Sequence, residues 1–168
     1  IRLSTDGFSF SIYNPIHDNS LSTIEKETDT SLSLTANLKA TFRESDFLNH
    51  SYKRVNIMMA DKRFTIVPLE LFEEEQAELL FYHNHQKREN ETVICNILKK
   101  NNVAIIFGMD KSAHTFLSEQ YPEAHFYSQS TPLIDYFSVK SRLGNSKKMY
   151  VSIGKQLTFI VLNGDICF

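Results

Sequence analysis

Hydrophobic and polar positions alternate near the start of the chain in a way that predicts strands. Phe8, Phe10 and Ile12 alternate with Ser9, Ser11 and Tyr13, and a period of two is typical of a strand with one buried face. Gly7 separates this strand from an earlier one, and a third strand is expected over residues 21–28. The chain is therefore expected to open with three consecutive strands.

After the third strand, the spacing of apolar residues changes to one that predicts a helix. Leu34, Leu38 and Phe42 follow one another at helical spacing, so we expect a helix over residues 31–43. The preceding Asp29-Thr30-Ser31 supplies residues suited to the N-cap position.

Strands and helices alternate through the rest of the chain. The predicted elements are a hairpin of strands 53–59 and 64–67, a helix over 73–84, strands over 92–98 and 103–107, a helix capped by Asp110, a strand over 124–128, a helix from Thr131-Pro132 to Gly144, and a hairpin from Met149 onward. The apolar run 103–107 suits a strand covered on both faces. This order predicts an α/β domain around a mixed sheet.

Composition narrows the class of protein. The chain has 168 residues, 42% of them hydrophobic, which is enough for one substantial core. A net charge of −2 disfavours a nucleic-acid partner, and no apolar run is long enough to predict a membrane span. The two cysteines, Cys95 and Cys167, make no disulfide framework, so we expect a reducing, cytoplasmic location.

Both chain ends fall within predicted strand patterns. Ile1 already belongs to a strand, and Phe168 follows the turn-like Asn163-Gly164-Asp165. We expect a piece of a longer protein, with a genuine C-terminal edge strand as the alternative.

A strand, a tight glycine turn and a second strand occur twice. The first turn contains Gly7, within residues 1–13, and the second contains Gly154, within residues 149–162. Glycine at such a turn allows the backbone to approach phosphate oxygens closely. The two hairpins therefore suggest a duplicated architecture.

These hairpins, with the three opening strands and the helix after them, resemble the actin-like ATPase superfamily of ribonuclease-H-like fold. The resemblance implies that residues 1–145 form the first of two related halves and that residues 146–168 begin the second half. The order of predicted elements separately suggests that residues of about 64–98, a strand, a helix and a strand, form a small subdomain inserted into the main sheet. The stretches 64–72 and 107–112 also resemble an uncharacterised bacterial family of unknown function that is grouped with this superfamily.

The candidate site departs from the superfamily pattern. In that pattern an aspartate stands two residues before each glycine and helps to hold magnesium, whereas here Thr5 and Ser152 occupy those places. Asp6 restores a carboxylate only by a one-residue slip, which turns a strand side chain to the opposite face. Thr5, Asp6, Gly7, Ser152 and Gly154 are therefore predicted to form vestigial phosphate-binding hairpins, and no catalytic or metal-binding residue is expected.

The resulting hypothesis is a catalytically degenerate actin-like protein that acts as a binding or scaffold module with a protein partner and no cofactor. The alternative is a nucleotide-binding ATPase or kinase that uses the Gly7 and Gly154 hairpins with Mg-ATP. A ribonuclease-H-type nuclease with Asp6, Glu25 and Asp61 also starts with three strands, but no repeated acidic pattern supports it.

Overall fold

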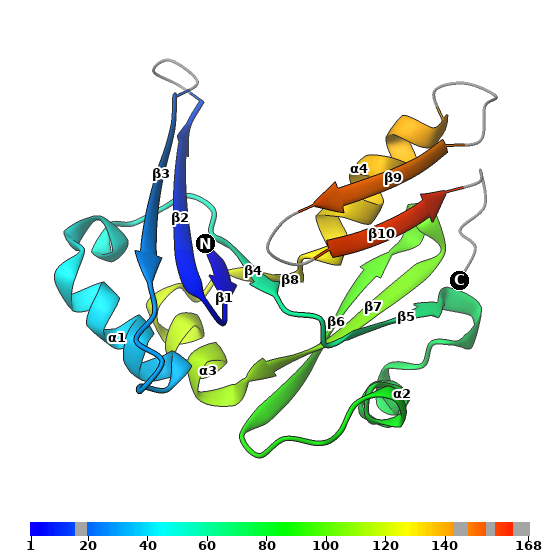
Figure 1. The fold of residues 1–168 in the computed structure, drawn as a ribbon, viewed down its shortest axis with the longest axis horizontal. Coiled ribbons are helices and arrows are strands. Elements are labelled where there is room, and N and C mark those ends of the chain that lie inside the picture. The colour runs from blue at the N-terminus through cyan, green and yellow to red at the C-terminus, as the bar shows by residue number, and fades with distance from the viewer. Residues whose placement is uncertain (16–19, 143–147, 154–156, 163–168) are drawn as a thin grey trace.

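A computed structural model describes residues 1–15, 20–142, 148–153 and 157–162, and the strands of these residues form three sheets (Figure 1). The largest sheet has five strands in the spatial order β3-β2-β1-β4-β8. Its strands are β1 Arg2–Ser4, β2 Gly7–Asn14, β3 Ser20–Glu27, β4 Asn56–Ala60 and β8 His125–Ser128. The first three strands are an antiparallel meander, and β4 runs parallel to both β1 and β8. The sheet is mixed, as the order of elements predicts.

A second, antiparallel sheet has the order β5-β7-β6, and β9 pairs with β10 as a separate hairpin. These strands are β5 Phe64–Pro68, β6 Glu91–Leu98, β7 Val103–Asp110, β9 Lys148–Ile153 and β10 Leu157–Leu162. The central strand β7 is buried from Val103 to Met109. This burial on both faces confirms the interpretation of the apolar run.

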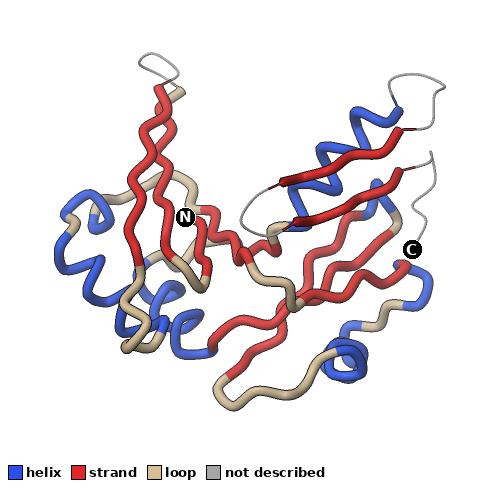
Figure 2. Tube along the Cα trace, viewed as in Figure 1, coloured by secondary structure: helices blue, strands red, loops and turns tan. Residues whose placement is uncertain are grey.

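The α-helices lie around the two larger sheets, outside the layer of strands (Figures 1 and 2). The α-helices are α1 Leu34–Glu44, α2 Ala77–Asn84, α3 Lys111–Gln120 and α4 Ser130–Arg142. The short 3-10 helices are η1 Asp46–Asn49, η2 Leu69–Leu71, η3 Glu74–Gln76 and η4 Lys99–Asn101. Helices α1 and α3 lie beside the five-stranded sheet, whereas α2 packs on the three-stranded sheet through Phe81 and Ala77.

One hydrophobic core joins the two larger sheets. Leu3 and Ile57 of the five-stranded sheet belong to the same cluster as Phe107 and Met109 of β7, and all four are almost completely buried. Full burial of one such side chain contributes about 1.5–3 kcal/mol of transfer free energy. The core therefore fixes how the sheets sit relative to each other.

The predicted order of strands and helices is confirmed in the described residues, but one predicted pairing is wrong. Residues 53–59 and 64–67 were expected to form a hairpin, whereas β4 pairs with β1 and β8, and β5 pairs with β7 in the other sheet. Arg63, immediately before β5, forms an ion pair with Glu91 at the start of β6. This contact holds the start of β5 beside the start of β6, and the ladder between β5 and β7 places β5 in the three-stranded sheet.

The first helix begins later than predicted. Ser33 is its N-cap and accepts a hydrogen bond from the Ala36 N–H, so the helix starts at Leu34. Asp29 instead uses its carboxylate to close a turn with Ser31. The segment 29–32 thus remains a loop, which brings Asp29 to the candidate site.

Candidate functional site

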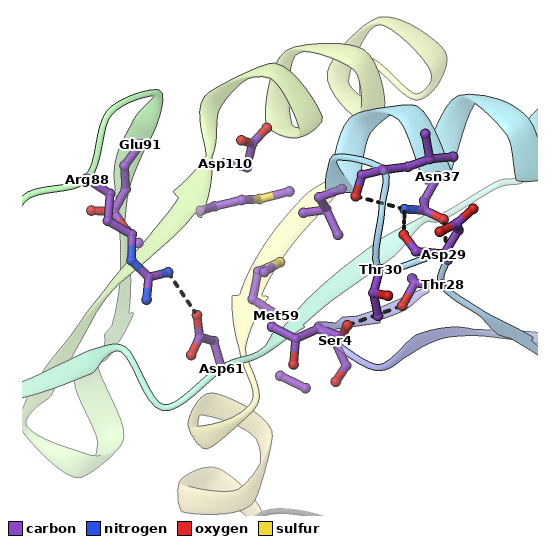
Figure 3. Close-up of a pocket in the computed structure, with 16 residues that line it drawn as sticks. Ser4, Thr28, Asp29, Thr30, Asn37, Met59, Asp61, Arg88, Glu91 and Asp110 are labelled. Carbon is purple, nitrogen blue, oxygen red and sulfur yellow. Dashed lines mark hydrogen bonds and ion pairs between the residues drawn. The ribbon is translucent and has the colours of Figure 1, made fainter.

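A pocket of about 370 Å³ lies between the five-stranded and three-stranded sheets (Figure 3). Ser4 and Ala60 reach it from the carboxyl ends of the parallel strands β1 and β4, and Gly108 reaches it from β7. Ligands of open α/β sheets bind outside the carboxyl ends of the strands. Thr5 also lines this pocket, which makes it the candidate functional site.

Asn37 organises the loop that forms one wall of the pocket. Its Nδ2 donates to the carbonyl oxygens of Asp29 and Ser33 at 2.9 and 3.1 Å, and its Oδ1 accepts from the Asp29 N–H at 2.8 Å. Asp29 Oδ1 accepts from the hydroxyl and the N–H of Ser31 at 2.6 and 2.8 Å. These two bonds to Ser31, the hydroxyl contributing most, lower the pKa of Asp29 and favour its ionised form.

Asp110 joins several elements at the pocket. It is the N-cap of α3, and its Oδ1 accepts from the Ala113 N–H at 2.7 Å and from the Thr35 hydroxyl at 3.1 Å. Its Oδ2 accepts from Asn90 Nδ2 at 2.8 Å. A negative charge at a helix N-terminus is favourable, so Asp110 both caps α3 and connects it to α1.

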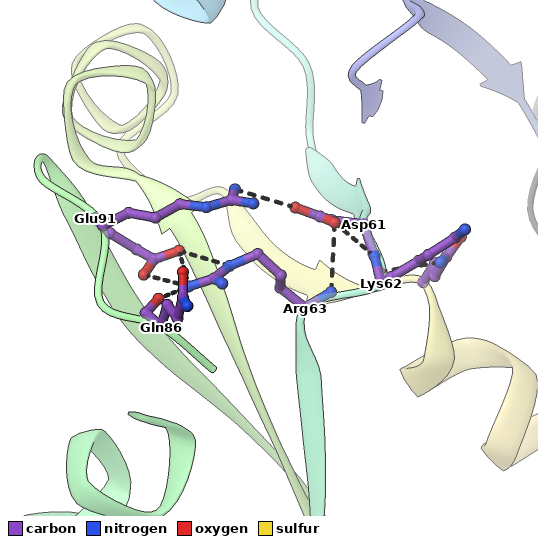
Figure 4. A network of polar contacts seen from close by, with 7 residues as sticks. Asp61, Lys62, Arg63, Gln86 and Glu91 are labelled. Atoms are coloured by element: carbon purple, nitrogen blue, oxygen red, sulfur yellow. Dashed lines mark hydrogen bonds and ion pairs between the residues drawn. The ribbon is translucent and has the colours of Figure 1, made fainter. Parts of the chain in front are cut away.

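Glu91 and Arg63 form a nearly buried ion pair (Figure 4). Arg63 Nη2 lies 2.9 Å from Glu91 Oε2, Arg63 Nε lies 3.2 Å from Oε1, and the two side chains are 12% and 6% exposed. Arg63 Nη2 also donates to the Gln86 carbonyl at 2.8 Å, and the guanidinium lies over the Phe81 ring. The pair is geometrically fixed, because each partner satisfies the other.

Asp61 is the fourth carboxylate that lines the pocket. Its Oδ1 accepts from the Lys62 N–H at 2.6 Å, and its Oδ2 lies 3.9 Å from Arg88 Nη1. Figure 4 shows Asp61 beside the linker that leads from β4 to Arg63. Asp61 therefore shapes the connection between the two sheets.

The three residues predicted as a site in the first hairpin, Thr5, Asp6 and Gly7, differ in how they relate to the pocket. Thr5 lines the pocket, and its carbonyl accepts from the Thr28 hydroxyl at 3.2 Å. The Asp6 carboxylate accepts from the Ser4 hydroxyl and lies outside the pocket wall. A Cβ added to Gly7 would lie 2.8 Å from the Lys26 carbonyl oxygen, so close packing against β3 already requires glycine there.

The second hairpin is only partly within the described residues. Ser152 pairs with Thr158 across β9 and β10, which confirms the two predicted strands. Gly154 lies outside the described residues, so the expectation that it faces a common groove with Gly7 remains a prediction.

Several residues that line the pocket were not predicted from the sequence as site residues. The structure adds Asp29, Asn37, Glu91 and Asp110 to Thr5. Asp110 could have been found, because it ends an apolar strand and begins a helix. Glu91 carries no sequence signal that separates it from other surface glutamates, because only tertiary contacts bury it beside Arg63.

Within the described ranges, no group of three or more His, Cys, Asp or Glu residues is arranged to hold a metal ion. No helix in those ranges has the length and apolar character needed to cross a membrane. A larger cavity of about 950 Å³, lined by Tyr13, Tyr52 and Tyr121 among others, contains none of the predicted site residues.

Comparisons with known proteins identify the fold and the family. The chain is 72% identical to a protein from Bacteroides thetaiotaomicron VPI-5482, whose crystal structure is described as that of a protein with actin-like ATPase fold and unknown function, and the two structures match with a TM-score of 0.91. The match covers 99% of this chain and 66% of that one. No curated protein is significantly similar in sequence. The chain thus has the actin-like ATPase fold, and because the family model matches residues 1–165, it belongs to the family described as "protein of unknown function (DUF3822)".

Proposed function

We propose that this protein is a catalytically degenerate member of the actin-like fold and acts as a binding or scaffold module for a protein partner. The chain spans 66% of the length of its solved relative, so the proposal concerns the part of the site that this chain supplies. A cytoplasmic location in a bacterial cell belongs to the same proposal.

One observation carries the proposal: each carboxylate that lines the pocket has a role within the chain. Asp110 caps α3, Glu91 pairs with Arg63, and Asp61 binds the backbone of the linker. Asp29 closes the turn at Ser31. A magnesium site needs anionic oxygens that converge on the ion, and these contacts aim the carboxylates at protein groups instead.

Thr5 adds to this argument. It occupies the place where the superfamily pattern has a magnesium-associated aspartate, and a neutral hydroxyl is a poor replacement. Loss of a metal ion and its activated water removes several kcal/mol of transition-state stabilisation. We therefore expect no ATP hydrolysis.

Nucleotide binding is the alternative function. A pocket of about 370 Å³ at the first hairpin is within the size range of small-molecule sites, and this observation favours it. Binding through backbone N–H groups alone would be weak and would not lead to hydrolysis.

Calorimetric titration of the full-length protein with ATP, with and without magnesium, tests the proposal. We expect no magnesium-dependent binding at micromolar concentrations and no phosphate release. Micromolar binding that needs magnesium and weakens in Thr5→Ala would instead establish the nucleotide-binding alternative. Thr5→Ala is a suitable variant because Thr5 is exposed. The hydrogen bond from the Thr28 hydroxyl is accepted by the backbone carbonyl of Thr5, which the substitution keeps.

A further inference from the structure

We propose that the larger cavity, of about 950 Å³, binds a segment of the protein partner that presents a bulky apolar side chain beside carboxylates. This inference rests on the proposed binding function and adds the chemistry of the ligand. An aromatic floor, a cationic rim and exposed apolar side chains at the mouth carry it.

The larger cavity lies at the opposite end of the five-stranded sheet from the first pocket. Asn56 and His125 line it, and they are the first residues of the parallel strands β4 and β8. Ser4 and Ala60 of the first pocket are instead the last residues of β1 and β4. Because the two sites lie at different ends of the strands, their ligands can be tested separately.

The floor of the cavity is apolar and held in place by contacts within the chain. Phe10, Leu48 and Tyr121 are buried lining residues, and Phe47 and Tyr52 are half-buried ones. The Tyr52 hydroxyl donates to the Phe47 carbonyl at 2.6 Å, and the Tyr121 hydroxyl donates to the Leu48 carbonyl. Since both hydroxyls are bonded within the chain, the floor offers apolar contact to a ligand. A large aromatic or aliphatic side chain suits such a preformed surface.

The rim of the cavity carries more positive than negative charge. Lys53 and Arg54 line it and are exposed, whereas Glu123 is the one acidic side chain among the lining residues. Within the described part of the chain, neither Lys53 nor Arg54 takes part in an ion pair. Arg54 Nε donates to the neutral Asn56 Oδ1 at 3.3 Å. Carboxylates of a partner would therefore complement this rim.

Exposed apolar side chains extend the cavity towards the tip of the β2–β3 hairpin. Tyr13 lines the cavity and is 58% exposed, and Leu21, which lies directly opposite it in the ladder, is 67% exposed. Side chains opposite each other in an antiparallel pair lie on the same face of the sheet. The hairpin projects beyond the other strands of its sheet, so this apolar surface is accessible to a partner (Figure 1).

The shape of the cavity favours a protein segment over a small molecule. Half of the residues that line it are exposed, so it is an open groove around a buried floor. Small-molecule sites usually enclose most of the surface of the ligand. A buried apolar centre within a polar, accessible rim is the arrangement of protein–protein interfaces.

Three hexapeptides test the proposal by calorimetric titration of the full-length protein. The first has a Leu-Phe pair with two aspartates on each side, the second has asparagines in place of the aspartates, and the third has alanines in place of Leu-Phe. We expect the first to bind, the second to bind several-fold more weakly, and the third to show no binding. Added salt should weaken binding of the first peptide. Absence of binding by the first peptide, or equal binding by either of the others, would overturn the proposal.

Variants at the rim and mouth locate the binding site. Lys53→Gln and Arg54→Gln should each weaken binding of the first peptide by roughly threefold, the effect of one exposed charge pair. Tyr13→Ala should weaken it by about fivefold or more, as expected for an aromatic contact at an interface. The controls are Lys99→Gln, an exposed change on η4, and Tyr136→Ala on α4, where the side chain is 56% exposed; both lie outside the cavity lining. Equal losses in the controls would reject the site.

Further measurements separate the other possible occupants. If 3-phenylpropionate bound more tightly than the first peptide, the groove would belong to a small carboxylate and the proposal would be rejected. Sedimentation velocity tests for a second copy, and self-association that Tyr13→Ala abolishes would also reject a partner segment. ATP is titrated in parallel. Magnesium-dependent ATP binding contradicts the proposed function itself, while failure of the peptides without ATP binding contradicts only this inference.

Discussion

Gly108 shows how one missing side chain permits the arrangement of the pocket. A Cβ at this position would overlap the Glu91 carboxylate and would lie 3.0 Å from Phe81 Cζ. Glu91 cannot move away easily, because Arg63 holds both of its oxygens. The residue is therefore required by packing against a charged group, and its backbone needs no unusual conformation.

Gly108→Ala is expected to destabilise the protein by about 1–3 kcal/mol, because overpacking forces the ion pair to shift. Urea denaturation measures this change in the free energy of unfolding. Since the main overlap is with Glu91, the same substitution in a Glu91→Ala background should cost clearly less. An equal cost in both backgrounds would contradict the explanation.

Cys95 gives a second prediction for a single residue. Burial, with a smaller effect of the Glu74 charge, raises the pKa of its thiol to about 11. The thiolate is the reactive form, so at pH 8 the folded protein should be alkylated at Cys95 much more slowly than a free cysteine, and denaturant should remove this protection. The assay uses Cys167→Ser, so that only Cys95 reacts. Alkylation at the rate of a free thiol without denaturant would contradict the prediction.

At the scale of elements, one side chain of β6 forms hydrogen bonds with the backbone of β8, the edge strand of the five-stranded sheet. Asn96 Nδ2 donates to the Phe126 carbonyl at 2.8 Å, and its Oδ1 accepts from the Ser128 N–H at 3.0 Å and from the Thr131 hydroxyl at 2.7 Å. These contacts imitate the hydrogen bonds of a neighbouring strand. They connect the three-stranded sheet to the edge of the five-stranded sheet.

Asn96→Ala should cost about 1–3 kcal/mol, because it leaves partly buried backbone groups unsatisfied. It should also accelerate amide exchange at Ser128 specifically, and NMR-detected hydrogen exchange measures that effect. Asn56→Ala, an exposed substitution in β4, is the control. Unchanged exchange at Ser128 would show that water replaces the Asn96 side chain without loss.

At the scale of the whole molecule, the shared core predicts common stability for the two larger sheets. Phe107 and Met109 pack in the same cluster as Leu3 and Ile57, so neither sheet buries its apolar face alone. Amides of β4 and β7 should exchange with equal opening free energies under native conditions. If β7 opened at clearly lower free energy than β4, the three-stranded sheet would be an independent folding unit.

The two-hairpin hypothesis is also tested at this scale. If Thr5 and Ser152 both replaced metal-associated aspartates, Thr5→Asp combined with Ser152→Asp should bind magnesium more tightly than either single variant, because magnesium prefers anionic oxygens. Titration of the full-length variants with magnesium measures the difference. If the double variant bound magnesium no more tightly than the single variants, the two turns would belong to separate sites.

The sequence by itself determined the elements and the family resemblance. Period-two alternation in β2, the apolar run of β7 and the cap at Asp110 are local signals, and each depends on residues close together in the chain. Two glycine turns and three opening strands were sufficient to indicate the actin-like fold, which the match to the solved relative confirms.

Only the tertiary structure decided the pairing of β4 and β5 and the composition of the pocket. Asp29, Asp61, Glu91 and Asp110 are separated by as many as 81 positions in the chain, and no local pattern marks them as neighbours. The sign of the charge around the pocket depends on which side chains converge and which are ion-paired. Such convergence results from long-range packing and hydrogen bonding, so it is absent from any short stretch of sequence.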